Sequence, residues 1–258
     1  MTTVFPMVSL VTIHYINLVL FFSRILGRFE TLYTPHQHLS LDEGMIPWRG
    51  NLHFRVYNPD KSSKYGIKAD MVSDPTNGYV SKFKLYTGKS NINPSRNGST
   101  YDLVMDMLRG FYGKGYSLYC DNYYSSPQLF WDLFELGVGA TGTVRVYRRG
   151  IPQALKDMNL ANKGDLAVMS NGPLSCTKYM DHKPVYMLST VHKSDIVNSN
   201  RKDPRTQEII QKPNVIIQYN KYMGGVDRSD QMISYANNIV KSFKWWKKLF
   251  FMFLQLLS

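Results

Sequence analysis

Hydrophobic and polar positions along the chain predict short strands followed by helices and strands in alternation. Strands are expected where apolar residues alternate with polar ones or form short apolar runs. Six segments have this pattern: 38–45, 52–58, 65–74, 78–88, 116–121 and 140–146. Turn-forming residues at 74–78 predict a hairpin between the third and fourth. Helices are predicted at 102–111 and from Pro127 to Gly137. This order predicts a mixed α/β sheet with helices on its faces.

The character of the chain changes after the last of these strands. Residues 147–173 are basic and rich in turn-forming residues, and strand-like runs at 166–169 and 185–191 predict a small β-containing annex. Residues 194–213 are polar, which predicts a linker. A final helical region is predicted from about Asp227 into an apolar, basic stretch near the C-terminus.

A mostly apolar run at residues 8–22 is the segment with the most membrane-like composition. His14 and Asn17 interrupt the run, and it is shorter than the ~20 residues that a spanning helix needs. A signal peptide has basic residues before its apolar run, whereas here Arg24 and Arg28 follow it. The composition therefore favours a buried or isolated helix over a signal anchor, and a membrane is not expected as a partner.

Composition and charge narrow the function classes. Apolar residues make up 43% of the 258 residues and aromatic ones 14%, which excludes a wholly disordered chain. The net charge of +12 favours a polyanionic partner, either nucleic acid or an anionic membrane face. Two cysteines, Cys120 and Cys176, exclude a disulfide scaffold and a four-thiolate zinc site, and a reduced compartment is expected.

Three acidic residues stand at the ends of predicted elements. Asp42 lies at the end of the first strand, Asp121 ends a later one, and Asp227 opens the last helical region. Carboxylates in these places can converge on one edge of a sheet, and such hard oxygen ligands suit Mg²⁺ or Mn²⁺. Two such ions, ~3.5–4 Å apart, can activate a water and stabilise the leaving oxygen in phosphodiester cleavage. The pattern therefore favours a carboxylate metal site that acts on a nucleic-acid backbone.

Each of these acids also has a structural alternative. An Asp that ends a strand before Asn or Gly is commonly a turn residue. Asp227 can cap a helix, with Asp230 favourable to the helix dipole. Glu43 adjoins Asp42, but successive strand side chains point to opposite faces, so only one of them can join a shared site. Spacing alone does not say which.

Six motifs resemble those of the piggyBac transposase family and occur in the family order. They are SLDEGMIPWRG at 40–50, LHFR at 52–55, KYGIK at 64–68, YCDNYYSS at 119–126, GTVR at 142–145 and YMGGVDRSDQM at 222–232. The likeness runs from about Tyr33 to the C-terminus. Several motifs in order are far more specific than any one of them.

The resemblance implies a catalytic core of the DDE recombinase type. Its fold class is α/β, an RNase H-like mixed sheet with flanking helices and a small β-containing insertion after the fifth strand. The annex corresponds to that insertion. The expected parts are an atypical apolar N-terminal segment (1–32), the first part of the core (33–146), the insertion (147–213) and a truncated last part of the core (214–258).

The resemblance also implies roles for the acids. The family's three catalytic, metal-binding aspartates fall at Asp42, Asp121 and Asp227, and Asp230 matches a fourth, supporting metal-site acid. The implied cofactor is a pair of Mg²⁺ or Mn²⁺ ions. The family nicks DNA at transposon ends, and the freed 3′-hydroxyl then attacks TTAA target sites. The implied partners are those DNA sequences and a second copy of the chain in a homodimer, and the implied location is the nucleus.

Departures from the family pattern keep two functions open. The apolar segment stands in place of the family's N-terminal DNA-binding portion, and two cysteines cannot form its Cys-rich zinc module. Tyr147 stands where the family commonly has Asn. The retained acids favour a transposase-derived enzyme with metal-dependent DNA nicking and strand transfer. The departures favour a non-enzymatic, element-derived DNA-binding or chromatin-associated protein whose acids are relics.

Overall fold

The computed structural model describes most of the chain after residue 30. The described residues are 24, 27–28, 31–59, 61, 63–88, 93–202, 207–235 and 242–257. The chain forms two compact units, residues 1–34 and 35–258, and every helix and strand named below belongs to the second. The apolar run at 8–22 lies outside the described residues. Within the described part, no helix is long and apolar enough to cross a membrane.

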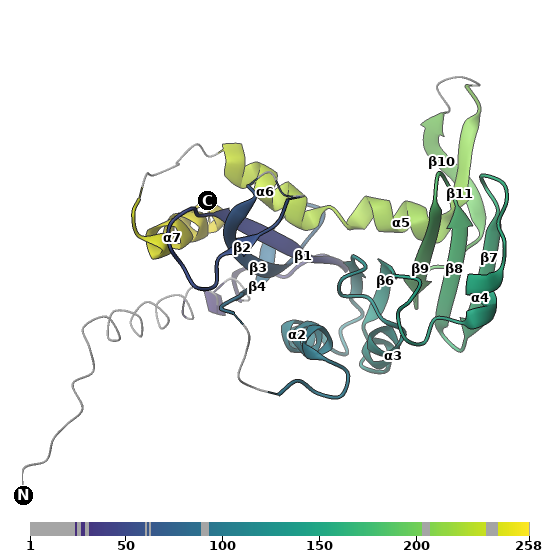
Figure 1. Cartoon of the computed structure of the whole chain (residues 1–258), viewed down its shortest axis with the longest axis horizontal. Helices are drawn as coiled ribbons and strands as arrows, with labels where there is room; N and C mark the ends of the chain where they lie inside the picture. Colours follow the sequence, from purple (N-terminus) through teal and green to yellow (C-terminus); the bar gives the residue numbers. More distant parts are fainter. Residues whose placement is uncertain are drawn as a thin grey trace, which may run out of the picture. The chain divides into compact units, whose positions relative to one another are not determined.

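A large mixed sheet organises the second unit (Figure 1). Its strands are β1 (His38–Pro47), β2 (Val56–Tyr57), β3 (Tyr65–Ser73), β4 (Val80–Leu85), β5 (Ser117–Cys120), β6 (Gly139–Thr143), β7 (Leu166–Asn171), β8 (Leu174–Met180) and β9 (Pro184–Ser189). They lie in the order β2-β3-β1-β5-β6-β9-β8-β7, and β4 also pairs with β3. β5 runs parallel to both β1 and β6, whereas the other pairs are antiparallel. The predicted mixed α/β sheet is confirmed.

Helices α2 (Ser99–Leu108) and α3 (Pro127–Glu135) cover one face of the sheet (Figure 1). Leu39 and Leu41 of β1 point to this face, where they join a buried apolar cluster with Val104 of α2 and with Leu129 and Phe130 of α3. Each fully buried side chain of this size contributes about 1.5–3 kcal/mol relative to exposure. The cluster fixes which residues of β1 face the helices and which face away.

Helices α5 (Asn214–Tyr222) and α6 (Gly225–Tyr235) cover the opposite face. Gly225 packs directly on the sheet, because a methyl group there would overlap Ser40 Oγ and lie 2.6 Å from Ser73 Oγ. A further helix, α7 (Trp245–Leu257), reaches the sheet through Phe253, whose ring centre is 4.9 Å from that of Phe83. Two short helices, η1 (Arg109–Phe111) and α4 (Gln153–Asp157), also belong to this unit.

Local sequence signals explain the bounds of α3. Ser126 Oγ accepts a hydrogen bond from the Leu129 amide at 3.3 Å, and Pro127 occupies the first turn. Gly137 follows the helix with a φ of 72°, a left-handed conformation that favours glycine. The predicted start at Pro127 and stop at Gly137 are both confirmed.

The region after β6 differs from the sequence prediction. β9 pairs with β6, with Thr141 opposite Ser189, so the strands of the annex continue the central sheet. The predicted linker is wrong, because its residues form a hairpin of β10 (Ile196–Lys202) and β11 (Ile209–Pro213). This hairpin is largely exposed, so backbone pairing defines it and no apolar alternation marks it. Helix α6 begins at Gly225, close to the predicted start near Asp227, but the preceding helix α5 was not predicted.

Candidate active site

The first acid of the candidate site lies on β1. Leu39 and Leu41 point toward α2 and α3, so the two-residue period of the strand turns Asp42 toward α6. Glu43 returns to the first face, where its Oε2 lies 2.7 Å from Lys68 Nζ. The two neighbouring acids therefore lie on opposite faces of the sheet. Asp42 faces α6, and Glu43 belongs to an ion pair on the other side.

Asp121 follows β5 at the same edge of the sheet. β1 and β5 are parallel neighbours with Leu41 opposite Cys120, so Asp42 and Asp121 are the next pair along. Asp121 Oδ1 accepts a hydrogen bond from the Tyr123 amide at 2.9 Å. Its main-chain oxygen accepts one from Ser125 Oγ at 2.8 Å. These bonds form a tight turn that fixes the carboxylate against its own loop.

The other two acids come from α6. Asp227 and Asp230 are three residues apart, which places them on the same side of the helix. Asp227 is exposed, whereas Asp230 is half-buried. The Asp230 carboxylate lies over β1, since its Oδ1 would be 3.8 Å from a methyl group on Gly44. The seating of Gly225 on the sheet thus brings both acids to the face that carries Asp42.

The four carboxylates interact electrostatically. Burial raises the pKa of Asp42 to about 6, and the charges of Asp121 and Asp227 raise it as well. Burial likewise raises the pKa of Asp230 to about 6, with a further contribution from Asp227. Lys61 opposes both shifts by lowering each pKa. Burial also raises the pKa of Asp121, and the amides of its own turn partly offset that rise. Residues far apart in sequence thus lie within electrostatic reach of one another.

The donor set fits a hard divalent cation in its chemistry. Carboxylate oxygens are the ligands that Mg²⁺ and Mn²⁺ prefer, and crowded anions with raised pKa values gain from a neutralising ion. Among the described residues, no three His, Cys, Asp or Glu side chains stand close enough together to hold a metal ion. The acids therefore share one edge of the sheet without being drawn to ligand distances.

A buried network supports the Asp121 turn from the other face of the sheet, and the sequence reasoning missed it. Tyr124 Oη donates a hydrogen bond of 2.6 Å to Asp70 Oδ1, and Lys68 Nζ lies 3.8 Å from the same oxygen. Lys68 Nζ also lies 4.5 Å from the centre of the Tyr123 ring. Lys68 belongs to the KYGIK motif, but its contacts depend on the pairing register of Glu43 with Asp70.

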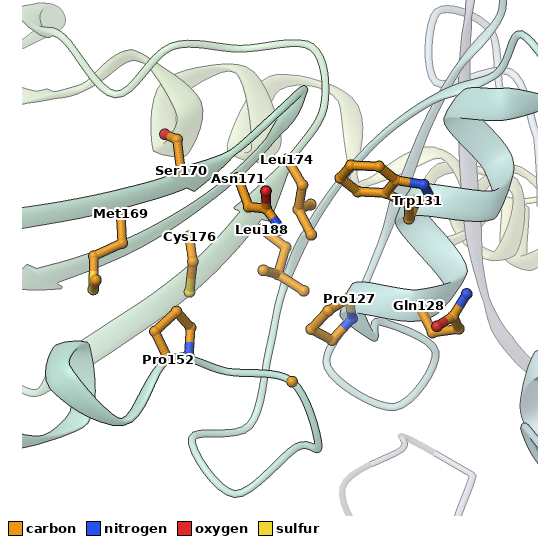
Figure 2. Close-up of a pocket in the computed structure, with 11 residues that line it drawn as sticks. Pro127, Gln128, Trp131, Pro152, Met169, Ser170, Asn171, Leu174, Cys176 and Leu188 are labelled. Carbon is orange, nitrogen blue, oxygen red and sulfur yellow. The ribbon is translucent and has the colours of Figure 1, made fainter.

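Two recesses differ in their relation to the acids. A largely apolar cavity of about 600 Å³ lies between α3 and strands β7 and β8, with Trp131 on one side and Met169 on the other (Figure 2). None of the four acids lines it. A more polar recess of about 520 Å³ adjoins the Asp121 turn and is lined by Tyr123, Arg148 and Arg149 among others. None of the four acids lines the second recess either, but its arginines suit a polyanion next to the Asp121 turn.

Comparison with known proteins identifies the family. The family model described as Transposase IS4 matches residues 17–258. Human "PiggyBac transposable element-derived protein 3" is 26% identical over 229 residues, which cover 83% of this chain and 38% of the relative. The chain belongs to this transposase family, on its piggyBac branch. Human "PiggyBac transposable element-derived protein 2" is 25% identical over 221 residues, which cover 80% of this chain and 37% of that protein.

A solved structure of the piggyBac branch has the same fold. The piggyBac transposase in a cryo-EM synaptic complex with hairpin DNA matches with a TM-score of 0.76 and 29% identity. The match covers 91% of this chain and 48% of that chain. The expected α/β catalytic fold is therefore confirmed for this piggyBac-type chain. The chain spans less than two fifths of the two human relatives, so the catalytic roles of its acids stay predictions.

Proposed function

We propose that this chain carries the catalytic centre of a piggyBac-type DDE transposase, which binds DNA and cleaves its backbone with divalent metal ions. The observation that supports the proposal is that Asp42 and Asp121 follow one another across β1 and β5 and that Asp227 lies within electrostatic reach of Asp42. The three acids come from β1, from the turn after β5 and from α6. The charges of Asp121 and Asp227 each raise the pKa of Asp42. A transposase core needs such a set of carboxylates from separate elements to surround its metal ions.

The proposed role of each residue follows from its position in the site. Asp42, Asp121 and Asp227 would hold Mg²⁺ or Mn²⁺, with Asp230 as a supporting acid. Bound ions of this kind supply an activated oxygen nucleophile and stabilise the leaving oxygen of an in-line displacement at phosphorus. The turn hydrogen bond from the Tyr123 amide orients the Asp121 carboxylate. Arg148 and Arg149 line the recess beside this turn and would neutralise phosphates of the DNA strand.

The substrate and location of the proposed enzyme follow from its charge and its relatives. A net charge of +12 favours attraction to DNA, and the solved relative was captured with hairpin DNA. We extend the proposal to transposon ends and TTAA targets as substrates, a homodimer as the assembly and the nucleus as the location. Nicking and strand transfer are both displacements at phosphorus, so one set of acids serves both steps.

One observation favours the second candidate function, a DNA-binding or chromatin-associated protein without catalysis. In the described part of the chain, the carboxylates are not gathered to ligand distances. A chain with relic acids would retain DNA binding through its basic surface and lack metal-dependent cleavage.

Nicking of supercoiled plasmid DNA in Mn²⁺ tests the proposal. We expect nicking by the wild-type chain, loss of nicking in EDTA, and a loss of at least about 100-fold in Asp121→Asn or Asp227→Asn. The matched control is Asp157→Asn, an exposed acid on α4, which should nick like wild type. Equal nicking by wild type and Asp121→Asn would contradict the proposed centre. DNA binding without nicking in every variant would favour the second function.

A further inference from the structure

Lys61 lies among the acids of the candidate site, although nothing in the sequence pattern gives it a role there. Its Nζ donates a hydrogen bond of 2.8 Å to the main-chain oxygen of Glu43. Glu43 stands between Asp42 and Gly44 on β1, and the Asp230 carboxylate lies over Gly44. The ammonium and two of the acids therefore gather around three consecutive residues of one strand.

The charge of Lys61 is directed at these two acids. Its Nζ lies at the carbonyl oxygen of Glu43, between Asp42 and the Gly44 position that Asp230 Oδ1 overlies, which places the positive charge beside both acids. Its hydrogen-bond acceptor is a neutral carbonyl, so this contact does not neutralise the positive charge. A half-buried ammonium in this position offsets the repulsion between neighbouring carboxylates.

Neighbouring lysines do not share this placement. Lys68 lies on the opposite face of the sheet and pairs with Glu43 and Asp70. Lys64 is exposed and lines a separate basic recess with Arg49 and Arg55. Lys64 therefore serves as a matched control, three residues away and of the same charge.

We propose that Lys61 is a positioning residue that acts as the counter-ion of Asp42 and Asp230 in the metal-free protein and competes with the divalent ion for them. This inference rests on the proposed function. A divalent cation held by these acids repels an adjacent ammonium, so the lysine lowers metal affinity below what the carboxylates alone would give. The metal-free site is in turn stabilised, because the acids keep a partner.

Two measurements on Lys61→Met test the inference with opposite signs. The substitution removes the charge and keeps an unbranched side chain. We expect Mn²⁺ to bind about tenfold more tightly by titration calorimetry at pH 7.5. We also expect a lower thermal unfolding midpoint in EDTA, because the two carboxylates lose their counter-ion. Lys64→Met should match wild type in both measurements. Lys61→Arg keeps the positive charge and should therefore stay close to wild type in both.

Other results would overturn the inference. A merely structural role would weaken Mn²⁺ binding and stability together in Lys61→Met, and unchanged Mn²⁺ affinity would exclude competition. If the wild-type chain itself does not bind Mn²⁺, the proposed function fails and the competition fails with it. Wild-type binding combined with unchanged or weaker binding in Lys61→Met sinks the role of Lys61 alone. The wild-type titration therefore distinguishes the two failures.

Discussion

Asp70 is a buried carboxylate whose partners hold the turn that carries Asp121. Asp70 is only 5% exposed, and its Oδ1 accepts a 2.6 Å hydrogen bond from Tyr124 Oη. Tyr123 and Tyr124 belong to the turn itself, so this contact links β3 to the position of Asp121. A buried acceptor that loses its donor costs its full desolvation penalty.

We predict that Tyr124→Phe destabilises the chain by about 1–3 kcal/mol, because it leaves Asp70 without this donor. Urea denaturation followed by circular dichroism measures the change. Tyr147→Phe is the matched control, since Tyr147 is 92% exposed and should lose nothing measurable. Equal stability of Tyr124→Phe and wild type would show that the hydrogen bond is not needed to hold the turn.

At this scale the positions of the acids in the sequence indicated candidate site residues, but spacing did not choose between Asp42 and Glu43; only the family resemblance implied Asp42. Asp121 and Asp227 stand out at the ends of predicted elements, whereas Asp42 was expected at a strand end and lies within β1. The choice between Asp42 and Glu43 needed the face of β1, which the buried Leu39 and Leu41 reveal only once the helices are placed. Contacts between a loop and a strand, such as that of Lys61 with Glu43, depend on loop paths that spacing does not encode.

At the scale of elements, the seating of α6 on the sheet controls the position of Asp227 and Asp230. Gly225 at the start of α6 touches Ser40 of β1 and Ser73 of β3, and a larger residue has no space there. Gly224, one residue earlier, has nothing within 4 Å of the position that a methyl group would take. A comparison of alanine substitutions at Gly224 and Gly225 therefore distinguishes the packing requirement from a general effect of replacing glycine.

We predict that Gly225→Ala destabilises the chain by about 1–3 kcal/mol through overpacking and weakens Mn²⁺ binding by displacing Asp227. Gly224→Ala should change neither quantity. Thermal unfolding and titration calorimetry on the two variants provide the comparison. If both alanines behave alike, close packing of α6 on β1 is not what positions the acids.

Element boundaries were predictable where local chemistry marks them. α3 carries a Ser126 cap, Pro127 in its first turn and Gly137 after its end, so its bounds follow from the sequence. α5 has no side-chain cap at its start, and its buried residues are only Val215 and Ile216. The hairpin of β10 and β11 is exposed, which makes its strands resemble a polar linker.

At the scale of the whole second unit, a polar cluster joins β1 and β5 to the segment after β9 and to α5. Tyr119 Oη lies 3.2 Å from His38 Nδ1 and 2.8 Å from His192 Nε2. The His38 ring also stacks on Tyr222, with 3.7 Å between the ring centres. Burial lowers the pKa of both imidazoles, and the charge of Lys221 lowers that of His38 further, against a smaller opposing effect of Asp74.

This cluster predicts a pH dependence of stability. A histidine with a folded-state pKa below its unfolded value near 6.5 binds fewer protons when folded. Its contribution to stability is therefore present above pH 6.5 and lost as the pH falls toward the lowered pKa. Asp42 and Asp230, whose pKa values are raised to about 6, act with the opposite sign. The histidine contribution must accordingly be measured as a difference between two proteins.

We predict that wild type loses more stability than His192→Gln when the pH falls from 7.5 to 5.5. Urea denaturation at several pH values gives the two slopes, and the aspartate contribution is common to both proteins. A steeper loss in His192→Gln than in wild type would show that protonation of this imidazole does not oppose folding.

Pairing between strands far apart in the sequence could not be predicted from the sequence. The annex appeared as a small separate feature because nothing local reveals that β9 pairs with β6. The resemblance to a known family implied an insertion after the fifth strand but not that its strands extend the central sheet. The charge of +12 indicated a polyanionic partner, but the sequence did not indicate that Arg148 and Arg149 line a recess beside the Asp121 turn.

The measurement that tests the central claim most directly is Mn²⁺ titration by calorimetry of the wild-type chain beside Asp121→Asn, with Asp157→Asn as control. It needs no particular DNA sequence, so it reports on the acids alone. We expect saturable binding by wild type and Asp157→Asn, and loss of that binding in Asp121→Asn, because one of the three carboxylates has become neutral. Equal Mn²⁺ affinity in wild type and Asp121→Asn would contradict the three-aspartate centre.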